Sequence, residues 1–202
     1  MQRQSPKRAP KRTIILASSS PYRKELLQRL GVPFEAHAPT IDESALPGED
    51  PAQLAGRLAR EKAEALARRF PQAVVIGSDQ VAVHRGRIVG KAGTVEGARR
   101  QLAAFSGASV RFLTAVCIRC QESGLCREDA VETRVVFRSL SDDEIHRYVE
   151  LDQPTDCTGS FKSEAAGSML LSAMHSSDPT AIIGLPLITV AEALRAAGFD
   201  LP

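Results

Sequence analysis

The stretch VVIGSDQVAVHRGRIVGK, residues 74–91, decides the fold because it joins a buried strand to an acidic side chain. Its apolar beginning, residues 73–76, is rich in β-branched side chains and is bounded by Pro71 and Gly77. Such a run predicts a strand that is covered on both faces. Asp79 follows, at the point where we expect this strand to open out.

A hairpin is expected next, because residues 81–83 and 88–89 are apolar and Gly86 lies between them. This hairpin would return Lys91 towards Asp79. An acid and a lysine at the same strand ends, beside Gly77 and Gly90, are typical of a phosphate and metal site, because glycine lets a ligand approach the backbone. Spacing alone also allows a loop-end carboxylate with a surface lysine.

Length and composition indicate one soluble globular domain over residues 13–202. The chain has 202 residues, of which 43% are hydrophobic and 25% charged, and its formal net charge is +2. Residues 1–12 carry part of the basic excess, and we expect a disordered tail there. No apolar run approaches the roughly 20 residues of a membrane span, so we predict a cytoplasmic protein. Because Trp is absent and aromatic residues make up 4%, no nucleic-acid partner is expected.

The four cysteines are interpreted as free thiols and not as a zinc site. Cys117 and Cys120 form a C-x-x-C motif, but residues 109–120 alternate like a strand. Residues three apart on a strand point to opposite faces, so these two side chains should not bind one metal. Cys126 and Cys157 complete the set, and reduced thiols are usual in the cytosol.

A further strand is expected at residues 13–17, followed by a serine turn and an amphipathic helix. Ser20 can cap this helix, and Pro21 suits its first position. The hydroxyl of Ser18, the free amides of the first helical turn and Arg23 would then face one anion site. The alternative is a capped helix whose Arg23 is solvated.

The rest of the chain is predicted to mix helices with long strands. Strands are expected at residues 34–38, 109–120 and 125–137, and helices at 51–70, 94–105, 141–151 and 186–197. Lys62 lies beside the apolar stripe of the first of these helices. Glu43 lies in the loop before that helix, and residues 157–167, which contain Glu164, form a candidate ligand loop.

Several motifs in a fixed order resemble those of the Maf family of nucleotide pyrophosphatases. They are ASSSPYRK from Ala17, IDE from Ile41, EKA from Glu61, GSDQV from Gly77, GK from Gly90, GSFKSE from Gly159 and IIGLP from Ile182. The resemblance covers residues 13–198. It departs at Ala92, where the family usually has proline. The combination of GSDQV with GSFKSE resembles the subgroup that acts on 7-methyl-GTP.

The resemblance implies an α/β fold of the Maf and ITPase-like kind, with a mixed twisted sheet, flanking helices and two lobes around a cleft. It also implies a homodimer and hydrolysis of a nucleoside triphosphate, with 7-methyl-GTP favoured, to the monophosphate and diphosphate. Asp79 is the expected general base. The expected phosphate ligands are Ser18, Arg23, Lys62 and Lys91; the metal ligands for Mg²⁺ or Mn²⁺ are Glu43 and Asp79; and the specificity residues are Tyr22, Gln80 and Glu164.

Two other functions stay open at this point. The first is the same reaction on dTTP, UTP or another non-standard nucleotide. The second is a non-enzymatic cytosolic regulator that binds nucleic acid or a protein partner through the basic residues 1–12.

Overall fold

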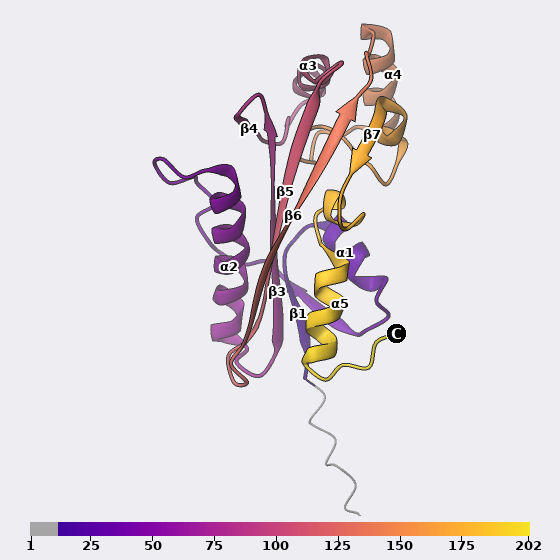
Figure 1. The fold of residues 1–202 in the computed structure, drawn as a ribbon. Helices are drawn as coiled ribbons and strands as arrows, with labels where there is room; N and C mark the ends of the chain where they lie inside the picture. The colour runs from indigo at the N-terminus through magenta and orange to yellow at the C-terminus, as the bar shows by residue number, and fades with distance from the viewer. Residues whose placement is uncertain (1–11) are drawn as a thin grey trace, which may run out of the picture.

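The computed structural model describes residues 12–202, which are built on one mixed β-sheet (Figure 1). The tail predicted for residues 1–12 thus lies outside the described residues, apart from Arg12. The strands run in the order β2-β1-β3-β5-β6-β7, and β4 pairs with β3. Their bounds are β1 Ile14–Ala17, β2 Phe34–His37, β3 Val74–His84, β4 Arg87–Val89, β5 Ser109–Cys120, β6 Leu125–Phe137 and β7 Leu171–His175.

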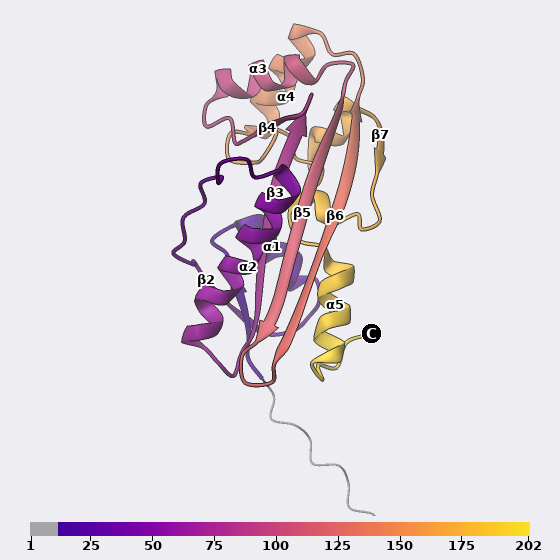
Figure 2. The ribbon, with the colours of Figure 1, turned by 60° about the vertical axis from the view of Figure 1, so that its left-hand side comes forward.

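Helices cover both faces of the sheet, as the apolar patterns predicted. Helix α2 packs on one face, and α1 and α5 pack on the other (Figure 1). A third core joins α3 and α4 to the far end of the sheet (Figure 2). The helices are α1 Pro21–Gln28, α2 Pro51–Arg69, α3 Val95–Phe105, α4 Asp142–Asp152 and α5 Leu187–Ala196, with short 3-10 turns η1 Ala166–Leu170 and η2 Ala181–Ile183.

The edge of β3 has a gap that positions the site. Strand β5 pairs with β3 along one edge, from Val75 to Val83. On the other edge, the pairing with parallel β1 ends at Gly77, and the pairing with antiparallel β4 starts at Ala82, which lies opposite Val89. Within the part of the chain that the structure describes, residues 78–81 therefore have a sheet neighbour on one side only. Their other edge is left to loops and side chains, which is where a ligand can approach a sheet.

The prediction that Asp79 lies where the strand opens out was wrong. Asp79 lies in the middle of β3, which continues for five more residues to His84. The reason is its long antiparallel partner β5, which pairs with β3 well beyond the end of β1. The opening belongs to the neighbour β1 and not to β3 itself.

The role predicted for Gly77 also needs correction. A Cβ atom at this position would lie 2.3 Å from the carbonyl oxygen of Ala59 and 2.6 Å from the backbone nitrogen of Ala63. Both residues belong to α2. The glycine therefore lets a helix, and not a ligand, approach the strand closely.

Local signals in the sequence identified most element ends. The hairpin turns at Arg85 and Gly86, whose φ angles of 49° and 75° match the type of tight turn that suits twisted strands. Ser20 caps α1 as predicted. Strand β7 was not predicted, because it is a short edge strand that pairs only with β6.

Two further predictions were tested by the fold. Cys117 lies in the core beneath α2, whereas Cys120 lies in the core of the opposite face, so the two do not face one another. Within residues 12–202, none of the helices has the length and apolarity needed to cross a bilayer.

Candidate active site

Strand β3 presents alternate side chains of GSDQ to two different partners. Asp79 points to the same face as Val75 and Val81, which pack against α2. Ser78 and Gln80 point to the opposite face and meet the segment of residues 178–186. One short motif thus connects a helix on one side of the sheet with a loop on the other.

Lys62 of α2 binds two carboxylates. Its Nζ lies 2.6 Å from Oδ1 of Asp79 and 2.9 Å from Oε1 of Glu43. The side chains of Lys62 and Asp79 are 7% and 12% exposed, whereas that of Glu43 is 62% exposed. The hydrogen bond from Lys62 lowers the pKa of Glu43, although partial burial opposes this effect. Among the described residues, no hydrogen bond reaches the second oxygen of either carboxylate.

Arg23 reaches the same site from the first turn of α1. Its Nε donates to the carbonyl oxygen of Gly184 at 2.8 Å, and the hydroxyl of Ser78 lies 2.9 Å from that oxygen. Burial lowers the pKa of the Arg23 guanidinium, while the negative charges of Asp79 and Glu43 oppose the decrease. The arginine is therefore fixed beside β3, close enough to both acids to interact with them.

The loop that holds Arg23 depends on residues that sequence analysis missed. Asp178 is 2% exposed and accepts hydrogen bonds from the backbone nitrogen of Thr180 at 2.8 Å, its hydroxyl at 2.6 Å and the nitrogen of Ile188 at 2.8 Å. Gly184 has a φ of 122°, a conformation that favours glycine. The IIGLP motif contained a signal for this loop, but Asp178 precedes the motif.

The remaining predicted phosphate ligands lie near the same edge. Ser18 follows β1 directly, is largely buried, and accepts a hydrogen bond from the backbone nitrogen of Ser20 at 3.1 Å. Lys91 forms an isolated β-bridge with Thr158, and its charge contributes to the lowered pKa of Glu43. Both positions agree with the hairpin and serine turn expected from the sequence.

The predicted specificity residues are only partly brought together. The hydroxyl of Tyr22 donates to Asp156 at 3.1 Å, and Nζ of Lys162 lies 5.7 Å from the centre of the Tyr22 ring. Glu164 is exposed, and its hydrogen bond is with its neighbour Ser163, at 3.4 Å. The structure thus pairs Tyr22 with Lys162 and not with Glu164.

Gln80 has a clear structural role. Its Nε2 lies 3.0 Å from Oγ1 of Thr114, 3.0 Å from the carbonyl oxygen of Ala181 and 2.9 Å from that of Ile182. These contacts hold the loop of residues 178–186 against β3 and β5.

The donor atoms of the site fit a hard cation. Glu43 and Asp79 supply carboxylate oxygens, which Mg²⁺ and Mn²⁺ prefer. They are two ligands only. The one group of three candidate metal ligands found in residues 12–202 lies elsewhere and consists of Cys117, Cys126 and Glu128.

Comparison with known proteins now identifies the family. The family model described as Maf-like protein matches residues 13–197. This chain belongs to the Maf family. The match spans all seven strands and all five α-helices found in residues 12–202.

Curated relatives match along nearly the whole Maf region. The chain is 52% identical to a protein of Polaromonas sp. over 94% of this chain and 87% of the relative, and 53% identical to one of Aromatoleum aromaticum over 94% and 97%. A protein of Xanthomonas campestris is 52% identical over 94% and 98%. All three are named 7-methyl-GTP pyrophosphatase.

The fold itself is shared with a more distant protein. The Ham1 protein of Staphylococcus aureus superposes with a TM-score of 0.51 at 12% identity, over 93% of this chain and 100% of that one. The mixed sheet with flanking helices predicted from the resemblance is thereby confirmed.

Proposed function

We propose that this protein hydrolyses a nucleoside triphosphate, with 7-methyl-GTP preferred, to the nucleoside monophosphate and diphosphate. The observation that carries the proposal is the cluster of Lys62, Asp79 and Glu43 with Arg23 beside it, at the gap between β1 and β4. With Lys91, the cations outnumber the carboxylates by one. Such a cluster suits a polyphosphate, whose negative charge needs fixed cations in the transition state.

Asp79 is the group best suited to activate water. In the reaction, the water oxygen bonds to the α-phosphorus, and the bond from this phosphorus to the oxygen that bridges it to the β-phosphorus breaks. Lys62 holds one oxygen of Asp79 and leaves the other to accept the water proton. The ammonium also keeps the carboxylate oriented within β3.

Cations around Asp79 would stabilise the charge that develops during the reaction. Arg23, Lys62 and Lys91 would contact the phosphoryl oxygens and the leaving diphosphate. The Ser18 hydroxyl and the amides that begin α1 would add neutral donors. Because Arg23 donates to the Gly184 carbonyl, which the Ser78 hydroxyl holds in place, little rearrangement of this side chain is needed when substrate binds.

A divalent cation such as Mg²⁺ or Mn²⁺ is part of the proposal. Glu43 would hold it through the oxygen that Lys62 does not bind, whereas Asp79, whose second oxygen accepts the water proton, would contact it through a cation-bound water. When bound, it would supply Lewis acidity at the phosphates. Lys62 and the cation would then contact the same two carboxylates. Before the cation binds, the charge of Lys62 reduces the repulsion between Glu43 and Asp79.

Tyr22, Gln80 and Glu164 are proposed to select the base. The ring of 7-methylguanine is positively charged, and the Tyr22 face already has the Lys162 ammonium near it. A cationic base would take the place of that ammonium in an interaction worth about 0.5–2 kcal/mol. Glu164 would accept hydrogens from the guanine edge once its loop approaches the base. Gln80 would act by fixing the backbone of residues 181 and 182.

A panel of nucleoside triphosphates tests the proposal. Release of diphosphate from 7-methyl-GTP, GTP, dTTP and UTP is measured with and without Mg²⁺ or Mn²⁺. We expect the highest kcat/KM for 7-methyl-GTP and dependence on the cation. Preference for dTTP or UTP would overturn the substrate assignment, whereas turnover of no triphosphate would favour the regulator hypothesis.

Two finer properties are proposed together with the activity. We retain a homodimer and a cytoplasmic location as predictions. Light scattering of the purified chain tests the first, and cell fractionation tests the second.

A further inference from the structure

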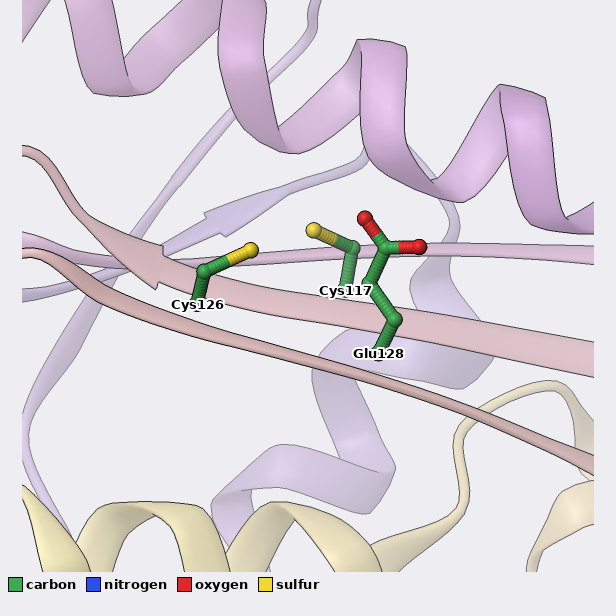
Figure 3. Close-up of side chains that lie close together, drawn as sticks. All are labelled: Cys117, Cys126 and Glu128. Atoms are coloured by element: carbon green, nitrogen blue, oxygen red, sulfur yellow. The ribbon is translucent and has the colours of Figure 1, made fainter.

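Two cysteines and a glutamate that are not among the residues of the candidate active site meet on one face of the β5–β6 hairpin (Figure 3). Cys117 of β5 is paired in register with Glu128 of β6, and Cys126 lies two residues earlier on β6. All three therefore point to the same face, which is the face that α2 covers. Their Sγ, Sγ and carboxylate oxygen atoms lie within 4.8 Å of one another.

These side chains match the ligand chemistry of zinc. Zn²⁺ binds thiolate sulfur at about 2.3 Å and carboxylate oxygen at about 2.0–2.2 Å, in tetrahedral geometry. Two such ligands on one ion are then separated by roughly 3.5–3.8 Å. The observed atoms, which lie within 4.8 Å of one another, are about 1 Å from this spacing, and water would supply the fourth ligand.

The backbone geometry favours a metal over a disulfide. Cys117 and Cys126 are diagonal neighbours on antiparallel strands, whose Cα atoms are about 7–8 Å apart. Disulfides require Cα atoms within roughly 6.8 Å. A bridging ion replaces the single S–S bond with two longer bonds through the metal, so it can join sulfurs whose backbones are too far apart for a disulfide.

The two sulfurs are also the ones without hydrogen-bond partners in the described chain. Cys120 donates to the carbonyl of Pro71, and Cys157 to that of Pro154. No such bond is found within residues 12–202 for Cys117 or Cys126. Cys126 is exposed and offers a route of entry, whereas Cys117 is buried. Burial raises the pKa of the Cys117 thiol to about 12, so a bound cation has to stabilise its thiolate.

We propose that Cys117, Cys126 and Glu128 form a Zn²⁺ site that is separate from the catalytic cation. A bound Zn²⁺ would compete with Arg60 of α2 for the carboxylate of Glu128. The Nε and Nη2 of Arg60 donate to the two oxygens of this carboxylate at 2.7 and 2.9 Å. Zinc binding thus exchanges a salt bridge between α2 and the hairpin for metal coordination. Arg60 lies two residues before Lys62, so the exchange occurs on the helix that holds the catalytic lysine.

Metal titration of the reduced, metal-stripped full chain tests this site. Co²⁺ serves as a spectroscopic probe, because thiolate ligands give a charge-transfer band in the near ultraviolet that oxygen ligands do not. Zn²⁺ affinity is measured against a chromophoric chelator. We expect one equivalent of Co²⁺ to give the band and Zn²⁺ to displace it.

Matched variants separate this site from other cysteines. Cys126→Ala should abolish the band and weaken Zn²⁺ binding by at least about 100-fold, since outer-shell changes alone cost roughly 10- to 100-fold. Cys120→Ala, a change on the same hairpin but the opposite face, should retain both. Arg60→Ala should tighten Zn²⁺ binding by roughly two- to fivefold, because it removes an exposed competing ion pair.

Three results would overturn the proposal. They are the absence of a thiolate band in the wild type, its persistence in Cys126→Ala, and equal losses in Cys126→Ala and Cys120→Ala. Circular dichroism checks that each variant is folded. Because Cys126 is exposed, its replacement is not expected to disturb the core.

Discussion

Replacement of Asp79 by asparagine separates its catalytic role from its structural one. Asp79→Asn keeps the shape of the side chain and an oxygen for the Lys62 ammonium, but it removes the carboxylate base. A positioned base contributes about 100- to 10,000-fold to rate. We therefore expect kcat to fall by at least about 100-fold at saturating nucleotide and Mg²⁺.

The expected loss of stability is much smaller. Removing one partner of a buried ion pair costs about 3–5 kcal/mol when the other charge is left alone. In Asp79→Asn, the Lys62 ammonium keeps its ion pair with Glu43, at 2.9 Å, and the amide oxygen at position 79 still accepts its hydrogen bond. Since a charged hydrogen bond exceeds a neutral one by about 1 kcal/mol, we expect a decrease of about 1–2 kcal/mol in the free energy of unfolding. A typical domain stability of about 5–15 kcal/mol tolerates this loss.

Two assays and one control make this prediction decisive. Diphosphate release gives kcat, and urea unfolding gives stability. Asp178→Asn alters another buried aspartate, which orders a loop and does not contact Lys62. It should lose comparable or more stability with a smaller loss of kcat. The assignment of Asp79 as the base is refuted if the kcat of Asp79→Asn stays within a few-fold of the wild-type kcat. It is also refuted if both variants lose kcat in proportion to their loss of free energy of unfolding.

Four further predictions follow from the site and its surroundings. Arg23→Lys should lower kcat more than it raises KM, because a single ammonium group cannot both contact the loop carbonyl and stabilise the transition state as the guanidinium does; steady-state kinetics would contradict this if KM alone rises. Tyr22→Ala and Glu164→Ala should each lower kcat/KM for 7-methyl-GTP more than for dTTP or UTP, and equal losses on all three nucleotides would argue against the specificity role. Gly77→Ala should destabilise the protein by about 1–3 kcal/mol, since a Cβ atom would meet the α2 backbone at 2.3 Å; an unchanged urea midpoint would mean that α2 shifts freely. The pKa of Glu43 is lowered in the folded state. Its contribution to stability is therefore present above the pKa that Glu43 has in the unfolded chain, and it is lost as pH falls through the pKa that Glu43 has in the folded protein. Glu43→Gln should therefore flatten this part of the stability curve in acid, and parallel curves for variant and wild type would exclude the contribution.

The local sequence determined the elements and most of the residues proposed for catalysis. Apolar runs, capping residues and the Arg85-Gly86 turn depend on chain neighbours only, so their signals are visible without a fold. The order of the short motifs was sufficient to suggest the Maf family, which the family model confirms over residues 13–197.

Tertiary structure alone decided how those residues act on one another. Asp79 lies inside a strand because a distant partner, β5, extends β3 beyond β1. Gly77 admits a helix because α2 crosses it, and no local pattern reports which helix will do so. Likewise, the spacing of Cys117 and Cys120 correctly excluded that pair, but only the register of β5 and β6 brings Cys126 and Glu128 to Cys117.

The same limit explains why Asp178 was missed. Its hydrogen bonds join the loop to the first turn of α5, within ten residues of Asp178, but the same loop places the Gly184 carbonyl that accepts from Arg23, 161 residues away in the chain. Sequence periodicity records which face of its own element a residue occupies. Which other element meets that face depends on strand register and helix packing, because these are fixed by contacts between segments that are far apart in the sequence.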